Sequence, residues 1–242
     1  MSQQLRRSET RPERLLVVAA HPHDADVAMA GSVARWVEEG TIAQLVCCTS
    51  GDGSADDAEA DPLALAATRE REQRAAASIV GYEGVTFLHR PDGAVANDLA
   101  LREQLVRLIR SFRPDTVAAP DPRCFLHPWG AVNHVDHRET GAAALDAVQP
   151  AAANALAFPG LARSEGLTPH RVARLCLYWS EQPSHAVDIG ATLERKARAV
   201  GTHASLPRRS QADASTVRAW AHTAAESLPV DAAETFALVD LA

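Results

Sequence analysis

Apolar residues along this chain gather in short runs that are separated by longer segments of mixed character. The runs cover residues 14–20, 41–49, 85–88, 116–119 and 174–179, and they show little alternation between apolar and polar positions. Strands that are covered on both faces of a sheet have this pattern. A last strand is expected over 234–241. The apolar pattern therefore predicts a buried sheet.

The segments between these runs predict helices. Residues 63–80 place apolar side chains at helical spacing, with Arg and Glu on the other side, and Gly81 ends the segment. Further helices are expected over 24–39, 98–111, 139–148, 189–201 and 214–225. Residues 151–170 are helical in composition at first and are broken by Pro159–Gly160. The strand and helix segments alternate from residue 14 to 119, which predicts an α/β fold with a parallel sheet and helices on both faces.

Polar turns follow the first four expected strands. They begin at His21 and at residues 50–53, 91–93 and 120–122. Ligands bind at the carboxyl ends of the strands in sheets of this kind. We therefore expect one pocket that these turns line, with residues 123–132 as a loop over it.

Composition and charge narrow the function classes. The 242 residues are 46% hydrophobic and 23% charged, and the formal net charge is −7. This balance is normal for a globular protein and argues against nucleic acid or an anionic membrane as partner. No apolar run approaches the ~20 residues of a membrane span. Residues 1–13 are polar and lack the apolar core of a signal peptide, so we expect a flexible arm before a single domain over 14–242, and a cytoplasmic location. The four cysteines form no CxxC pair and are expected to be buried free thiols.

Two clusters of metal-ligating residues stand out. Five of the six residues 21–26 are His, Pro or Asp, and they contain an H-x-x-D unit, His21 and Asp24. The second cluster, residues 134–137, is an H-x-D-H unit. Catalytic zinc takes three protein ligands and leaves a position for water, whose pKa it lowers toward neutrality. His21, Asp24 and one of His134 or His137 would complete such a site.

Other candidates are weaker on residue pattern alone. Arg69 lies in a charged helix and is expected to be a solvated charge. The remaining histidines are expected on the surface or as satisfied core residues, although His127 and His185 could lie at the rim of the pocket. No G-x-G-x-x-G follows the first strand and no G-x-S-x-G is present, which argues against a dinucleotide site and an α/β-type serine hydrolase.

The two clusters and several segments between them resemble the LmbE-like, or PIG-L, family of deacetylases. AHPHDAD followed by AGSVAR is similar to the family's AHPDDE or AHPDDAD signature and the helix after it, and NHVDHRETG is similar to its HPDHRxxG segment. TSGDG, TREREQRAAA, FLHRPDG and RPDTVAAPDP stand between them in the family's order. The resemblance covers roughly residues 14–206.

This resemblance implies a Rossmann-like, three-layer α/β/α domain with a mostly parallel sheet and one zinc ion. It implies an amidase or deacetylase that acts on a small N-acyl amino sugar or a thiol-conjugate-like amide. By position, the zinc ligands would be His21, Asp24 and His137. His134 would stabilise the oxyanion or donate a proton, with Asp136 orienting it. We expect no nucleic-acid or membrane partner, and assembly into a homo-oligomer is one option.

The resemblance also changes the interpretation of Arg69 and exposes one departure. Arg69 matches a family arginine that helps to hold the substrate. His23 occupies the position of the family's general base, an Asp, and a neutral imidazole can accept a proton near pH 7. The first hypothesis is thus a zinc-dependent hydrolase with His23 as base. The second is a metal-binding, non-hydrolytic or altered-activity descendant in a biosynthetic pathway, and the third is a nucleotide-binding α/β protein without a metal.

Overall fold

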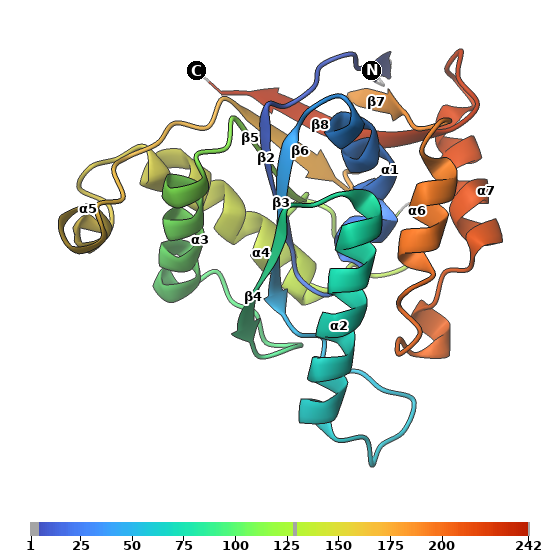
Figure 1. Cartoon of the computed structure of the whole chain (residues 1–242), viewed down its shortest axis with the longest axis horizontal. Helices are drawn as coiled ribbons and strands as arrows, with labels where there is room; N and C mark the ends of the chain where they lie inside the picture. The colour runs from blue at the N-terminus through green and yellow to red at the C-terminus, as the bar shows by residue number, and fades with distance from the viewer. Residues whose placement is uncertain (1–4, 128–129, 242) are drawn as a thin grey trace.

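Eight strands form one mixed sheet in the part of the chain that the computed structural model describes, residues 5–127 and 130–241 (Figure 1). Their order across the sheet is β1-β7-β8-β6-β5-β2-β3-β4. The strands are β1 (Arg6–Arg7), β2 (Arg14–Ala19), β3 (Ile42–Thr49), β4 (Gly84–Arg90), β5 (Thr116–Pro120), β6 (Arg174–Tyr178), β7 (His185–Asp188) and β8 (Ala233–Asp240). All pairings among β2, β3, β4, β5 and β6 are parallel, whereas β8 runs antiparallel to β6 and β7.

The chain changes direction across the sheet at β2. It passes from β2 to β3 and β4 on one side, and then returns to β5, which pairs with the other side of β2. Such a reversal opens a crevice beyond the carboxyl ends of the two central strands, and ligands bind there. The H-x-x-D unit follows β2 and the H-x-D-H unit follows β5 in the chain. The topology therefore brings the two units to the same crevice.

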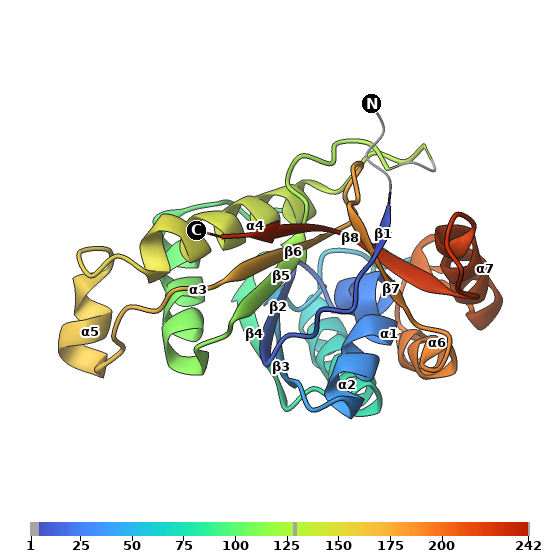
Figure 2. The same ribbon diagram turned by 90° about the horizontal axis from the view of Figure 1, so that it is seen from above.

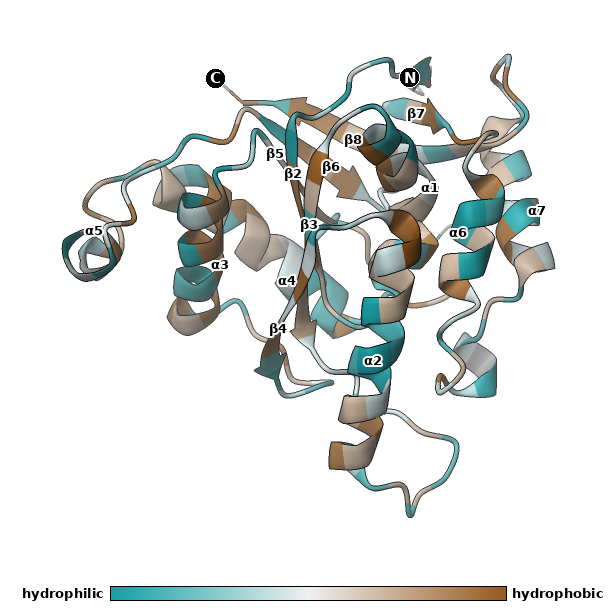
Figure 3. Cartoon of the chain, viewed as in Figure 1, coloured by the Kyte–Doolittle hydropathy of each residue, from teal (hydrophilic) through white to brown (hydrophobic). Residues whose placement is uncertain are grey.

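Helices cover both faces of the sheet, as Figure 2 shows from above. α1 (Asp24–Glu38), α2 (Pro62–Val80) and α6 (Leu193–Val200) lie on one face, with α7 (Ala214–Ala225) beside α6. α3 (Leu99–Phe112), α4 (Val135–Asp146) and α5 (Pro159–Glu165) lie on the other. Leu15 and Val17 of β2 pack in the core under α1, while Leu16 and Val18 pack in the core under α3 and α4. Both faces are buried, which explains why the strands lack alternation. Figure 3 colours the chain by hydropathy, and β6 is mostly brown, the hydrophobic end of the scale.

Local capping sets where several helices begin and end. The Asp61 carboxylate accepts a hydrogen bond from the Leu63 N–H at the start of α2, and Pro62 occupies the first turn. α2 ends at Gly81, whose φ of 104° lies in the left-handed region that glycine adopts without strain. Asp98 caps α3 in the same way as Asp61. These caps confirm the helices predicted over 63–80 and 98–111.

The structure corrects several expected elements. β1 and β7 were not predicted, and β1 pairs with β7, so residues 6–7 of the expected flexible arm belong to the edge of the sheet. α4 begins at Val135, four residues earlier than expected, because His134 caps it. Pro159 begins α5 rather than breaking a helix, since proline fits the first helical turn. The four cysteines are free and buried, as predicted. No described helix is long and apolar enough to cross a membrane.

Candidate metal and active site

A cavity of about 610 Å³ opens at the carboxyl ends of the central strands. His21, His23 and Asp24, which follow β2, line it together with Asp92 after β4 and with His134 and His137 from the start of α4. The predicted convergence of strand ends is thus confirmed for two of the four turns, those at His21 and at 91–93; no residue of the turn at 50–53 lines the cavity, although the next residue, Ser54, does. Residues 120–122 are not among the lining residues.

His21, Asp24 and His137 form one compact group in this cavity. Asp24 Oδ2 lies 3.3 Å from His21 Nδ1 and 3.4 Å from His137 Nε2. The ligand atoms of the three residues all lie within 4.8 Å of one another. Four ligands at about 2.0–2.1 Å from a tetrahedral zinc ion would stand about 3.3–3.4 Å apart. The spacing therefore fits a zinc ion.

Hydrogen bonds behind the group fix which atoms face its centre. His137 Nδ1 contacts Asn133 Oδ1 at 2.7 Å, and the Asn133 amide donates to the Cys124 carbonyl through Nδ2 at 2.8 Å. His137 must then donate from Nδ1, which leaves the Nε2 lone pair toward Asp24. Metal-binding histidines generally donate their other ring N–H in this way. His21 likewise contacts Asp92 and Asp136 through Nε2, at 3.0 and 3.2 Å, and turns Nδ1 toward Asp24.

The buried carboxylate of Asp24 does not use both of its oxygens in hydrogen bonds with the described residues. Its side chain is fully buried, and Oδ2 accepts a hydrogen bond from the His21 N–H at 2.8 Å. Among the described residues Oδ1 has no hydrogen-bond partner, although His23 Nδ1 lies 3.7 Å from it. A buried carboxylate oxygen without a partner carries an energetic cost unless a cation or donor satisfies it. The buried carboxylate thus keeps one oxygen without a hydrogen bond and directs the other, Oδ2, at two imidazole nitrogens, and a metal ion held there would neutralise its charge.

Opposite charges within the group shift one another's pKa values. Burial alone would lower the pKa of His21, but the carboxylates of Asp24, Asp136 and Asp92 raise it well above its usual value. Burial alone would raise the pKa of Asp24, but His137 and His21 lower it well below its usual range. Asp24 is therefore a carboxylate, the form that a metal requires.

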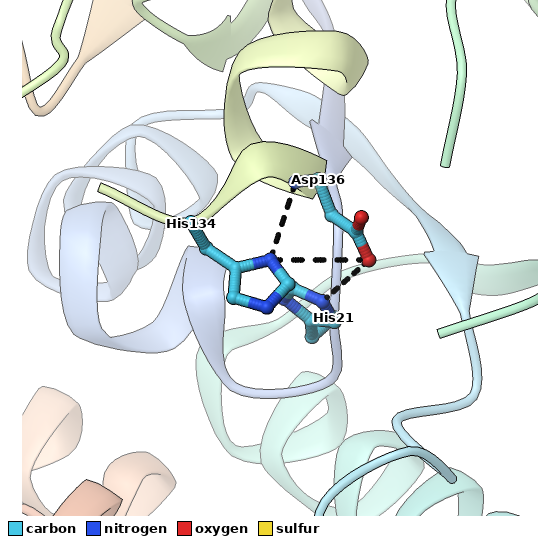
Figure 4. Close-up of side chains that lie close together, drawn as sticks. All are labelled: His21, His134 and Asp136. Atoms are coloured by element: carbon cyan, nitrogen blue, oxygen red, sulfur yellow. Dashed lines mark hydrogen bonds and ion pairs between the residues drawn. The ribbon is translucent and has the colours of Figure 1, made fainter. Parts of the chain in front are cut away.

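Asp136 and His134 form a second pair beside His21 (Figure 4). Asp136 is fully buried, and its oxygens accept hydrogen bonds from the Gly93 and Val95 N–H groups at 2.7 and 3.1 Å. His134, Asp136 and His21 also lie close enough to hold a metal. Because the oxygens of Asp136 already have donors, this second group fits an ion less well than the first.

The ring of His134 has a defined proton position. The Asp136 N–H donates to His134 Nδ1 at 3.2 Å, so Nδ1 carries a lone pair and Nε2 carries the proton. Burial and the neighbouring His21 lower the pKa of His134, which favours this neutral form. His134 thus offers an N–H donor at the cavity, 4.9 Å from the His21 ring between centroids.

His23 lies at the cap of α1 in an unusual backbone conformation. Its φ of 90° is in the left-handed region, which side chains other than glycine rarely adopt. The buried Gln73 holds this conformation, since Gln73 Oε1 accepts the His23 N–H at 2.7 Å and Gln73 Nε2 donates to Asp26 at 2.8 Å. His203 completes the network through Nε2, 2.9 Å from Asp26 Oδ2.

The ring of His23 is neutral and has a free nitrogen. Burial lowers its pKa, and the Pro22 carbonyl accepts a hydrogen bond from its Nδ1. The proton then resides on Nδ1, so Nε2 is available as an acceptor. The side chain lines the cavity. A neutral imidazole with a free Nε2 is a suitable proton acceptor near pH 7.

Arg69 is not the solvated charge that its sequence context predicts. It is 4% exposed and lines the cavity. Its guanidinium donates to the carbonyls of Gly51, Ser54 and Ser205, the last two at 2.7 and 3.4 Å. Arg69 therefore joins two loops of the rim, while its buried Nε has no partner. This placement is compatible with the substrate contact that the resemblance implies.

Some residues of the site escaped the sequence interpretation. Asp92 follows a predicted strand in a turn, and that position was its one signal. Asp26 belonged to the cluster 21–26, but its link to Gln73 and His203 was not foreseen, because these partners are far away in the chain. Gln73 and Asn133 gave no signal. His127 lines the cavity as anticipated, but His185 lies on β7 and is not among the lining residues.

Comparisons with known proteins agree with this geometry. Residues 16–148, more than half of the chain, match the family model PIG-L, described as GlcNAc-PI de-N-acetylase. A diacetylchitobiose deacetylase from Thermococcus kodakarensis is 30% identical over 196 residues, which are 80% of this chain and 70% of that protein. A 1D-myo-inositol 2-acetamido-2-deoxy-alpha-D-glucopyranoside deacetylase from Kineococcus radiotolerans is 27% identical, over 73% of this chain and 54% of that protein.

A solved structure has the same fold. N,N'-diacetylchitobiose deacetylase from Pyrococcus horikoshii, complexed with its inhibitor MPG, superposes with a TM-score of 0.82 at 27% identity. The match covers 95% of this chain and 84% of that one. It bears out the α/β/α architecture and the mostly parallel sheet. The sequence motifs, the family model and the fold agree, and this chain belongs to the PIG-L, or LmbE-like, family of N-deacetylases.

Proposed function

We propose that this protein is a zinc-dependent hydrolase that removes an acyl group from an N-acyl amino sugar or a related small amide. The observation that carries the proposal is the group formed by His21, Asp24 and His137. Asp24 Oδ2 lies 3.3 and 3.4 Å from the two imidazole nitrogens, which fits a tetrahedral ion, and the carboxylate is buried with its other oxygen unbonded among the described residues. Related proteins that act on acetylated glucosamine units support the substrate class.

His21, Asp24 and His137 would hold one zinc ion per chain. Bound zinc supplies a Lewis acid that polarises the acyl carbonyl and lowers the pKa of water. Asn133 and Asp92 keep the two imidazole rings in the required tautomers through the hydrogen bonds described above.

His23 is the proposed general base. Its Nε2 faces no protein donor in the described contacts, and the Pro22 carbonyl holds the proton on Nδ1. Burial keeps the ring neutral by lowering its pKa. His23 Nε2 therefore takes the proton of the attacking water, the role that an Asp has at this position in the family signature. General base catalysis of this kind contributes typically 10²–10⁴-fold to a rate.

His134 is the proposed electrophilic partner. The Asp136 N–H keeps its proton on Nε2, so this N–H is available to the carbonyl oxygen as negative charge develops on it. Asp136, whose carboxylate is anchored to the Gly93 and Val95 N–H groups, positions the ring. Arg69 is the proposed contact for a polar group of the substrate, from its place in the rim.

The competing hypotheses receive less support. A non-hydrolytic descendant was suggested by His23 alone, whereas the family model and the two sequence relatives are described as deacetylases. A nucleotide-binding protein without a metal would not require His21, Asp24 and His137 to lie so close together. Neither hypothesis gains from any contact in the cavity.

The decisive experiment measures zinc content and amide cleavage together. Purified protein is expected to hold about one zinc per chain and to release free amine from N-acetylglucosamine-containing substrates, with activity lost on chelation and regained with zinc. His137→Ala is expected to lose both zinc and activity. His134→Ala is expected to keep zinc and lower kcat. Protein that holds zinc but cleaves no N-acetyl sugar or thiol-conjugate amide across a broad panel would contradict the proposal.

A further inference from the structure

The cavity does not end at the His21–Asp24–His137 group. It continues along α1 into a region that we call the apolar compartment. Its wall consists mainly of apolar side chains from three elements, α1, the segment after α6, and α7: Val27, Ala28, Leu206, Trp220, Ala221 and Ala224. The compartment and the catalytic group share one cavity of about 610 Å³, a volume typical of sites for drug-sized ligands.

The compartment begins one helical turn from the proposed base. The Val27 N–H donates to the His23 carbonyl at 3.0 Å, so Val27 lies on the same face of α1 as His23, about 6 Å further along the axis. At about 1.2 Å of extension per bond, an acetyl group spans less than this rise. A chain of about five or more carbon atoms would span it.

The charged residues in this wall are already paired. Lys196 Nζ donates to Glu234 at 2.6 Å and to the Val27 carbonyl at 2.7 Å. The Glu234 carboxylate also accepts hydrogen bonds from the Gly31 and Ser32 N–H groups of α1, at 3.1 and 2.7 Å. Because these groups satisfy one another, they require no polar ligand. The wall therefore favours an apolar occupant.

Trp220 leaves apolar surface for such an occupant. It lines the cavity from α7 and is 50% exposed, although it is one of the largest apolar side chains in the chain. A ligand in the compartment would bury part of this indole, and burial of apolar surface is the main source of affinity in such sites. α7 itself packs against α6 and β8, so it forms a fixed wall opposite α1.

Polar groups lie at the other end of the cavity. Arg69, Asp92 and Ser54 line it near the catalytic group. Hydroxyl groups of an amino sugar would find the charged side chains of Arg69 and Asp92 there. Beside the compartment, apart from the Lys196–Glu234 pair, the polar side chains are those of the hydroxyl-bearing residues Ser210, Thr223 and Thr235. The amine side of the scissile bond thus fits the polar end, which leaves the acyl side for the compartment.

We propose that the apolar compartment receives the acyl chain of the substrate, so that this protein prefers N-acyl amino sugars with acyl chains of about five or more carbons over acetylated ones. This inference rests on the proposed function. The acyl group would then be the part of the substrate that contacts α7 and determines the preference. The names of the relatives above refer to acetylated substrates. A preference for longer acyl chains would therefore distinguish this chain from them.

A chain-length series tests the inference. Release of glucosamine is measured from N-acetyl-, N-butyryl-, N-hexanoyl- and N-octanoylglucosamine. We expect kcat/KM to rise by up to about fourfold for each methylene group that becomes buried, until the compartment is full. Ala224→Phe fills the compartment and is expected to bring the ratio of hexanoyl to acetyl kcat/KM toward one. Trp220→Ala, which removes wall surface without adding bulk, is expected to lower the same ratio.

Ala219→Phe is the matched control, because Ala219 is exposed on the same helix and does not line the cavity. It is expected to keep the ratio of the unaltered protein. Cleavage of the acetyl substrate without any gain from longer chains would overturn the inference and leave the proposed function intact. So would a gain from hexyl N-acetylglucosaminide but not from N-hexanoylglucosamine, which would assign the compartment to the amine side.

A binding measurement decides the inference even without catalysis. If no amide is cleaved, the proposed function fails, and calorimetric titration with N-hexanoyl- and N-acetylglucosamine is used instead. Tighter binding of the hexanoyl compound, abolished by Ala224→Phe, would support the compartment. Equal affinity for the two compounds would overturn it.

Discussion

His137 donates a hydrogen bond from Nδ1 to the Asn133 side chain over 2.7 Å, and this contact directs His137 Nε2 toward Asp24. Asn133 is 1% exposed and is itself anchored to the Cys124 carbonyl. One amide thus determines the tautomer of a residue four positions later, across the start of α4. The metal site that we propose depends on this contact as well as on its three ligands.

Asn133→Ala is expected to weaken zinc binding by about 10–100-fold, because His137 loses the acceptor that fixes its ring. Competition with a chelator of known affinity measures the effect. Asn133→Asp keeps an acceptor oxygen for His137 and is expected to retain most of the zinc affinity. Equal zinc affinity of the alanine variant and the unaltered protein would show that the hydrogen bond does not position the ring.

His23→Ala is expected to lower kcat by about 10²–10⁴-fold while zinc remains bound, since the proposed base is lost and the three ligands stay. His23→Asp restores an acid–base group, and Asp tolerates the left-handed backbone found at this position. We expect it to recover activity relative to His23→Ala. The measurement is kcat with zinc content determined on the same samples. A His23→Ala variant with full kcat would remove His23 from the mechanism.

Lys196→Met is expected to destabilise the protein by about 3–5 kcal/mol, because it leaves the buried Glu234 carboxylate without its cation. Urea denaturation gives the free energy of unfolding. Arg195→Met on the same helix is the control. Its ion pair with Glu38 is largely solvated, and we expect a change of about 1 kcal/mol or less. Similar losses for both variants would contradict the importance of the Lys196–Glu234 pair.

Asp121 is expected to make stability depend on pH in the acid range. Burial acts to raise its pKa, but hydrogen bonds from Arg123 and its charge lower it. A carboxyl whose pKa is lower in the folded state stabilises that state above its unfolded pKa of about 3.9, and this contribution is lost as pH falls through the folded value. Asp121→Asn should therefore be less stable at pH 7 and lose less stability between pH 5 and 2. Denaturation curves across this range check the sign.

Much of the fold followed from local pattern. The runs at 14–20 and 41–49 indicated strands buried on both faces, and Asp61 with Pro62 and Gly81 marked the limits of a helix. These features depend on neighbours within a few residues. β1 and β7 were missed because they have two and four residues and exist only through their pairing with each other and with β8.

The sequence by itself determined the two His/Asp units and the side of the sheet on which they lie. Residue pattern left His134 and His137 as equal candidates for the third ligand, and the family resemblance favoured His137. Tertiary structure gives the physical argument for this proposal, since the Asp136 N–H occupies His134 Nδ1 whereas Asn133 turns His137 Nε2 toward Asp24.

The apolar compartment and the Gln73–Asp26 support of His23 were decided by tertiary structure alone. They form where α7 faces α1 and where α2 meets the cap of α1, between residues that are distant in the chain. Short-range sequence patterns record capping and periodicity, which are interactions between neighbours. The direction of a lone pair and the walls of a cavity depend on packing between separate elements, and so they are fixed only once the chain has folded.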